Sequence, residues 1–264
     1  TQTKRIRLSS AVTVLSSDDP IRVHQQFATL DGLSNGRAEI LAGRGSFIES
    51  FPLFGYDLAD YDRLFAEKLG RLLSLREGAV PGVHPIPVQQ PMPLWIAVGG
   101  TPQSAARAAS LGLPMALAII GGDPARFVPF FDLHREAWSR AGRKPEDARL
   151  SLNMHGFVAA TTEEAMSTFE GPHQEVMNRI GRERGWPPQG HSHFEASCGP
   201  RGHLIIGDAE RVAEKIVSLH RDFGNHRILV QMAIGAMPHK SVLKAIELMG
   251  TKVAPLVRAA LSKN

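Results

Sequence analysis

The stretch Gly36-Arg-Ala-Glu-Ile-Leu-Ala-Gly-Arg-Gly-Ser46 sets the pattern from which the fold can be predicted. It follows Asn35 at the end of a predicted helix, runs through a short apolar segment, and ends with glycines on both sides of Arg44. An apolar run of this length between turn residues predicts a buried β-strand over 37–42. Glycine lacks the Cβ atom that would hold a ligand away, and arginine offers planar, permanently charged donors for a phosphate. A strand that ends in a solvated turn is the alternative.

The same alternation of apolar and amphipathic segments continues along the chain. Strands are predicted near residues 5, 37, 94, 115, 149 and 227, and helices over 20–35, 60–77, 103–111, 124–141, 163–169, 208–219 and 240–261. Strand alternating with helix indicates a parallel sheet, either open or closed into a barrel. No Gly-x-Gly-x-x-Gly motif opens the first helix, which argues against a dinucleotide-binding fold.

Several predicted strands end in glycines or polar residues, which fits the ligand-binding face of a barrel. We therefore predict one (β/α)8 TIM-type barrel domain over residues 1–264. The polar segment 171–203 breaks the alternation and is expected to be an excursion from the barrel, with a short helix near 175–184.

Composition excludes several classes of protein. The single cysteine, Cys198, rules out an internal disulfide framework and favours a cytoplasmic setting. The net charge is +4, and the basic residues are interspersed with acidic ones and form no basic stripe. No nucleic-acid partner is therefore expected. No apolar run approaches the length needed to span a membrane, and no membrane partner is expected.

The turn Val98-Gly-Gly-Thr-Pro-Gln-Ser104 is the second candidate for an anion site. A buried strand passes through Gly99 and Gly100 into a helix with Thr101 and Ser104 at its start. Free backbone amides and the positive end of the helix dipole suit a phosphate. A helix capped by Thr101, with no ligand, is the alternative.

Two further side chains are candidates for the active site. His155 belongs to an apolar strand, where a barrel would point it toward the active-site mouth as an acid, a base or a hydrogen-bond partner. Gln231, in the last strand, is a candidate ligand contact. For each the alternative is a structural residue of the core. The histidines at 173, 191 and 193 match no metal-site spacing, so no metal is expected.

Taken together, these segments resemble the bacterial luciferase-like, flavin-dependent monooxygenases. The resemblance rests on segments 5–15 and 27–37, the strand end Gly43-Arg-Gly-Ser46, and four further stretches: Pro85-Ile-Pro-Val-Gln89, the turn 98–104, Gly207-Asp208 and Pro255-Leu-Val-Arg258. It covers most of the chain.

The resemblance implies an FMN-binding barrel that uses reduced FMN, supplied by a separate reductase, and dioxygen. Residues matching Arg44 and Ser104 hold the phosphate in that family. Ser10, Ala11 and Thr13 would lie beside the flavin ring, and Gly43 and Gly45 would let the ring approach the backbone. Relatives are often homodimers.

The chain departs from the family pattern in its first part. Two strand-helix units that normally come first are absent, and with them the family's catalytic histidine candidate. Either the sequence omits part of the natural protein, or the barrel is reduced to six strands. We expect the omission, because a barrel without these units would expose strand edges.

Three functions remain open at this stage. The first is an FMN-dependent monooxygenase that acts on a small, largely apolar substrate. The second is a deazaflavin-dependent enzyme that transfers hydride, and the third is a flavin-binding protein without turnover.

Overall fold

The computed structural model describes residues 2–45 and 49–262, so Ser46, at the end of the quoted strand, lies outside the described residues. The chain forms two compact units. The first comprises Thr1–Val98 and Ser110–Ala116, and the second comprises Gly99–Ala109 and Leu117–Asn264. The prediction of one domain over 1–264 stays a prediction.

The strands of the first unit are organised around β3. They are β1 (Leu8–Ser9), β2 (Thr13–Val14), β3 (Ala38–Gly43) and β4 (Leu94–Val98). β1, β2 and β4 all pair with β3 in parallel, with Leu8 opposite Ala38, Thr13 opposite Ala42, and Ile40 opposite Leu94. All six residues of β3 are buried, as expected for a parallel strand covered on both faces.

The helices of the first unit are α1 (Pro20–Ser34), the short α2 (Ser50–Leu53), the 3-10 turn η1 (Leu58–Asp60) and α3 (Tyr61–Arg76). α1 begins where the sequence predicts, because the Asp19 carboxylate accepts hydrogen bonds from the backbone amides of Ile21 and Arg22. It ends at Asn35, which has the left-handed φ of 58° common at helix C-termini.

A buried carboxylate fixes the position of β3 within the first unit. Asp31, in α1, is fully buried. Its carboxylate accepts hydrogen bonds from the Gln89 backbone amide at 2.8 Å, the Gln89 side-chain amide at 2.6 Å and the Ala38 amide at 3.2 Å. The Gln89 side chain also donates to the Ala38 carbonyl at 2.8 Å. Asp31 and Gln89 therefore join α1, the start of β3 and the proline-rich connector that precedes β4.

The second unit contains β6 (Leu150–Val158), β7 (Ile205–Gly207) and β8 (Arg227–Gln231), while β5 (Met115–Ile119) begins in the first unit and ends in the second. β6 pairs in parallel with both β7 and β8. Gly156 opposes Ile205, and His155 opposes Gln231.

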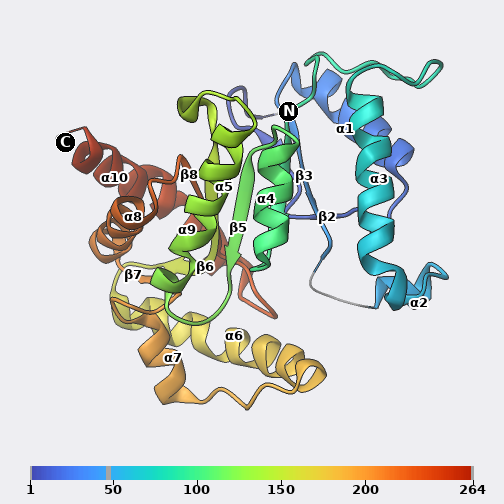
Figure 1. The fold of residues 1–264 in the computed structure, drawn as a ribbon. Coiled ribbons are helices and arrows are strands. Elements are labelled where there is room, and N and C mark those ends of the chain that lie inside the picture. The colour runs from blue at the N-terminus through green and yellow to red at the C-terminus, as the bar shows by residue number, and fades with distance from the viewer. Residues whose placement is uncertain (1, 46–48, 263–264) are drawn as a thin grey trace. The chain divides into compact units, whose positions relative to one another are not determined.

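The helices that belong wholly or mainly to the second unit follow the strands in alternation (Figure 1). They are α4 (Pro102–Ser110), η2 (Pro124–Phe127), α5 (Val128–Arg140), η3 (Pro145–Asp147), α6 (Thr162–Arg184), α7 (His191–Cys198), α8 (Ala209–Phe223), α9 (His239–Leu248), the π-helical turn η4 (Met249–Val253) and α10 (Ala254–Leu261). The predicted α/β class and parallel pairing are confirmed.

Two predictions were wrong in detail, and one strand was missed. The strand predicted near residue 5 is two dipeptide strands separated by residues 10–12. The helices predicted over 163–169 and 175–184 are one helix, α6, which contains Pro172. β7 was missed because only three residues pair there, too few for a periodic signal.

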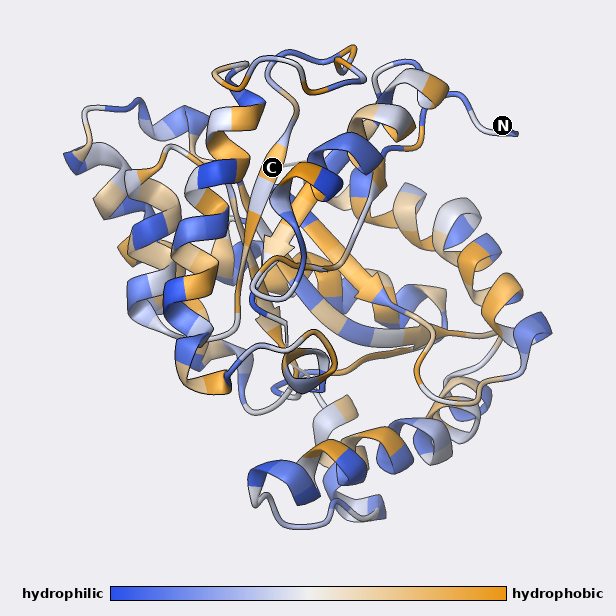
Figure 2. Cartoon of the chain, turned by 90° about the vertical axis from the view of Figure 1, so that its right-hand side faces the viewer, coloured by the Kyte–Doolittle hydropathy of each residue, from blue (hydrophilic) through white to orange (hydrophobic). Residues whose placement is uncertain are grey.

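Hydropathy follows the pattern expected for covered parallel strands. The strands in Figure 2 are largely apolar, whereas the helices carry polar and apolar residues on different sides. In the part of the chain that the structure describes, no helix combines the length and apolar character needed to cross a membrane.

Replacing Asp31 by alanine should lower the free energy of unfolding by about 2–4 kcal/mol, because it leaves the buried amide of Ala38 and the partly buried backbone amide of Gln89 without their acceptor. Urea unfolding followed by circular dichroism measures this loss. The matched control is Asp132→Ala, because Asp132 is exposed and paired with Arg135 at 3.3 Å. It should cost less than about 1 kcal/mol. Equal losses in both variants would contradict the role assigned to Asp31.

Candidate functional site

Arg44 follows directly after β3, and its guanidinium lies between a carboxylate and an aromatic ring. Nη1 donates to Asp62 Oδ1 at 2.5 Å, and Cζ lies 4.9 Å from the centroid of the Tyr61 ring. The Arg44 side chain is 24% exposed, and that of Asp62 is 73% exposed. The Tyr61 hydroxyl donates to the Gly45 carbonyl at 3.1 Å, so it also holds the turn that carries Arg44.

The two glycines that flank Arg44 are required by packing within the first unit. A Cβ atom on Gly43 would lie 3.0 Å from Val12 Cγ2 and 3.1 Å from Ala97 Cβ. Gly45 has a φ of 80°, and a Cβ atom there would lie 2.8 Å from Val14 Cγ1. Both contacts are closer than real Cβ atoms normally allow, so a larger residue at either position would force its neighbours to shift.

The candidate flavin-ring segment also lies in the first unit. The hydroxyls of Ser10 and Thr13 share a hydrogen bond of 2.9 Å. Ser10 Oγ lies 3.4 Å from both the carbonyl and the amide of Leu41 in β3. Ala11, between them, is exposed. These contacts fix the segment beside β3, while its role toward a flavin stays a prediction.

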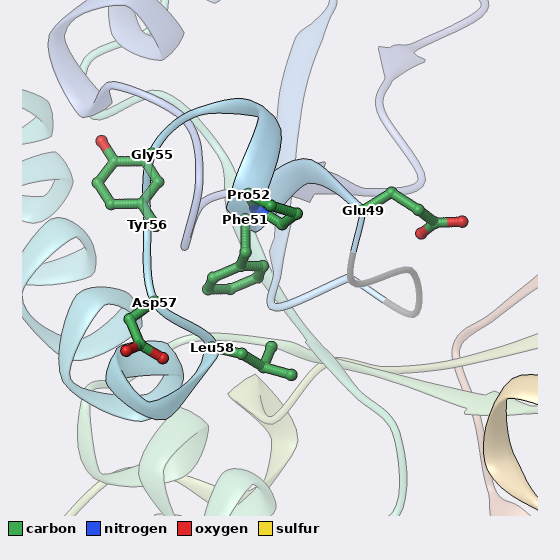
Figure 3. A pocket seen from close by; sticks show the side chains of 7 residues that line it. All are labelled: Glu49, Phe51, Pro52, Gly55, Tyr56, Asp57 and Leu58. Carbon is green, nitrogen blue, oxygen red and sulfur yellow. The ribbon is translucent and has the colours of Figure 1, made fainter.

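A surface pocket of about 720 Å³ lies in the same unit (Figure 3). It is lined by Glu49, Phe51, Pro52, Gly55, Tyr56, Asp57 and Leu58. The Phe51 and Tyr61 ring centroids are 5.3 Å apart, so a wall of the pocket packs on the ring that supports Arg44. The mostly apolar lining and the volume suit a small organic molecule.

In the second unit, the turn 99–104 has its hydroxyls paired with each other. Thr101 Oγ1 and Ser104 Oγ lie 2.6 Å apart, and the Ser104 amide donates to the Thr101 carbonyl at 3.0 Å. Gly100 has a φ of 109°, which favours glycine. The ligand role of Gly99, Gly100, Thr101 and Ser104 stays a prediction.

The second unit also contains a cluster of buried histidines that we name the histidine cluster: His155 of β6, His173 of α6 and His203, which precedes β7. Their exposed fractions are 8%, 2% and 2%. The rings of His155 and His173 lie 5.7 Å apart, centroid to centroid, at 81°. His173 is stacked on Phe169 at 5.5 Å and lies 5.9 Å from Phe194 of α7.

Four ring nitrogens of the histidine cluster lack a hydrogen-bond partner among the described residues: Nδ1 of His155, both nitrogens of His173 and Nε2 of His203. Burial lowers the pKa of His155. Burial, followed by the neighbouring histidines, lowers the pKa of His173 to about 3. The same causes lower the pKa of His203 to about 4. All three rings are therefore neutral at pH 7.

Gln231 lies opposite His155 in the pairing of β6 with β8. Its side chain is exposed and donates to the Ala233 carbonyl at 3.2 Å. The structure thus brings together two of the predicted site residues, on neighbouring strands. Their role as ligand contacts stays a prediction.

Sequence reasoning missed His173, His203, Tyr61 and Asp62 as members of these arrangements. A signal for His173 was present, because Phe169, His173, Met177 and Ile180 recur at helical spacing and form the buried face of α6. Nothing in the sequence pairs Asp62 with Arg44, 18 residues away. In the described part of the chain, no group of three or more histidine, cysteine or acidic side chains could hold a metal ion.

Comparison with solved structures defines the class of fold. Monooxygenase RslO1 from Streptomyces bottropensis superposes with a TM-score of 0.78 at 23% identity, over 96% of this chain and 79% of that one. The FMN complex of a type II Baeyer-Villiger monooxygenase, the oxygenating constituent of 3,6-diketocamphane monooxygenase from Pseudomonas putida, has a TM-score of 0.72 at 17% identity. That match covers 97% of this chain and 81% of that one. The coenzyme F420-dependent tetrahydromethanopterin reductase from Methanopyrus kandleri has a TM-score of 0.69 at 20% identity, over 96% of this chain and 84% of that one. The fold is that of the (β/α)8 barrel enzymes, as predicted, and the chain represents part of such a barrel.

The family model for luciferase-like monooxygenases matches residues 1–226. The chain therefore belongs to the luciferase-like monooxygenase family, and its enzyme class is oxidoreductase. Relatives include protein y4vJ of Sinorhizobium fredii, 24% identical over 99% of this chain and 81% of that protein. The 4-hydroxyprotoasukamycin monooxygenase of Streptomyces nodosus subsp. asukaensis is 25% identical over 98% of this chain and 76% of that protein.

The histidine cluster makes the second unit sensitive to acid. The folded protein holds these rings neutral, whereas the unfolded chain binds protons near pH 6.5, so the stabilisation is complete above pH 6.5 and is lost as pH falls toward 3. Each such histidine should lower the free energy of unfolding by roughly 1.4 kcal/mol per pH unit in that window. Urea unfolding from pH 7 to pH 5 measures the slope.

The variant His173→Phe keeps the aromatic packing. It should reduce the dependence of the unfolding free energy on pH by the contribution of one histidine. Replacing the exposed His239 by glutamine is the matched control and should leave the slope as it is. An unchanged slope in His173→Phe would show that His173 does not contribute to the acid sensitivity.

Proposed function

We propose that the protein is an FMN-dependent monooxygenase, which uses reduced FMN and dioxygen to oxidise a small, largely apolar organic substrate. The reduced FMN would come from a separate reductase, and the enzyme would act as a homodimer. Membership of the luciferase-like family supports the reaction class. The FMN complex among the structural neighbours and the relative that is named a monooxygenase agree with it.

The observation that carries the proposal is the placement of Arg44. A permanently charged guanidinium stands at the end of a fully buried strand, partly exposed, with an exposed carboxylate as its hydrogen-bond partner. A phosphate dianion can replace such a carboxylate, because an arginine binds phosphate through two parallel N–H donors. The donor set of Arg44 therefore fits the FMN phosphate.

The second unit, taken by itself, carries two hydroxyls and a neutral imidazole that suit a ligand. Thr101 and Ser104, at the start of α4, would donate to the oxygens of an anion. His155 would exchange a proton or a hydrogen bond at its buried Nδ1 atom, since a neutral ring can act as either donor or acceptor. FMN, when bound, supplies the electrons and the reaction with dioxygen.

The apolar pocket over residues 49–58 is the proposed place for the substrate. Pro52 and Leu58 are exposed and offer an apolar surface above the buried Phe51, which would keep water from the reacting groups. An F420-dependent oxidoreductase is the second candidate, because F420-dependent enzymes stand among the structural neighbours. A flavin-binding protein without turnover is the third.

Binding of reduced cofactors under anaerobic conditions separates these candidates. We expect reduced FMN to bind more tightly than reduced F420. After mixing with dissolved oxygen, the protein should introduce a slow phase into the recovery of flavin absorbance. Tighter binding of F420 would overturn the proposal. Tight FMN binding with the oxidation kinetics of free FMN would favour a flavin-binding protein.

The variant Arg44→Ala should weaken FMN binding roughly 10- to 100-fold, because a charge-assisted hydrogen bond to the phosphate is lost. Riboflavin has no phosphate, so its affinity should stay the same. Titration of flavin fluorescence gives both dissociation constants. An equal loss for both ligands would remove Arg44 from phosphate binding.

A further inference from the structure

We infer that Asp62 is a built-in competitor for the anion at Arg44, and that it sets how readily a phosphate-bearing cofactor binds and leaves. This inference rests on the proposed function. A flavin that moves between a reductase and an oxygenase has to be released in every cycle. A carboxylate that takes the place of the phosphate would keep that exchange fast.

Different residues hold the Arg44 guanidinium in place and neutralise its charge. Tyr61 places its ring against the guanidinium, with Cζ 4.9 Å from the ring centroid, and a hydrogen bond fixes Tyr61 to the Gly45 carbonyl. The cation can therefore keep its place without a carboxylate. Asp62 contributes a single hydrogen bond, from Nη1, and no other hydrogen bond to this guanidinium is found among the described residues.

The exposure of Asp62 suits a group that can be displaced. Its side chain is 73% exposed, so the carboxylate regains water when it leaves Arg44, and the cost of breaking the pair is small. If Asp62 stays in place, its negative charge repels a phosphate at the same cation. In both cases Asp62 lowers the affinity for phosphate.

A role in helix stability does not distinguish Asp62 from its neighbour. Asp60 and Asp62 both lie at the start of α3, where negative charge is favourable. Asp60 pairs with Arg63 at 3.0 Å, whereas Asp62 pairs with Arg44. The variant Asp60→Asn therefore removes the same charge from the same helix end and leaves the Arg44 contact intact.

The test measures FMN and riboflavin binding to Asp62→Asn by flavin fluorescence. FMN should bind about threefold to tenfold more tightly, and riboflavin should bind as in the parent protein. Asp60→Asn should change FMN binding much less. In the double variant Arg44→Ala/Asp62→Asn, the gain from Asp62→Asn should disappear, because it acts through the guanidinium.

The outcomes separate the inference from the proposed function. If Arg44→Ala weakens FMN selectively but Asp62→Asn leaves FMN binding unchanged or weaker, Asp62 is not a competitor. If Arg44→Ala has no selective effect on FMN, the phosphate role of Arg44 fails first. If Asp62→Asn does not fold, competition of inorganic phosphate with FMN in Asp62→Ser gives the same comparison, and unchanged competition would overturn the inference.

Discussion

The position of β3 depends on one buried carboxylate. Asp31 is fully buried and accepts hydrogen bonds from the first residue of β3 and from Gln89 in the connector that precedes β4. Because β1, β2 and β4 all pair with β3, the same contacts fix the register of those strands. The same contacts also fix the end of β3, which Arg44 follows. The cation is thus held by the core of its unit, although its own side chain is only partly buried.

The two units use charge in opposite ways. In the first unit, a permanent cation is paired with an exposed anion, an arrangement that a ligand can exchange at little cost. In the second, three buried imidazoles remain neutral because burial and mutual repulsion oppose protonation. The histidine cluster joins β6, α6 and α7 through aromatic contacts. The first arrangement suits ligand exchange, and the second keeps three neutral rings in the core of its unit.

The sequence predicted those features that local chemistry determines. The start of α1 at Pro20 and the buried run of β3 follow from residue type and spacing, and both were confirmed. The glycines beside Arg44 were predicted for the approach of a ligand, yet within the first unit they make room for Val12 and Val14. The polar segment around Pro172 divided α6 into two predicted helices, so its continuous buried face, which includes His173, was not recognised. Long-range pairs such as Asp31 with Gln89 and Arg44 with Asp62 have no local signal, so their geometry required the structure.

A crystal structure of the protein with bound FMN tests the central claim most directly, namely that Arg44 is the phosphate ligand. We predict two guanidinium nitrogens within about 2.8 Å of phosphate oxygens. We also predict that the Asp62 carboxylate has moved away from Nη1 of Arg44. A phosphate bound elsewhere, with the pair of Arg44 and Asp62 intact, would contradict the account.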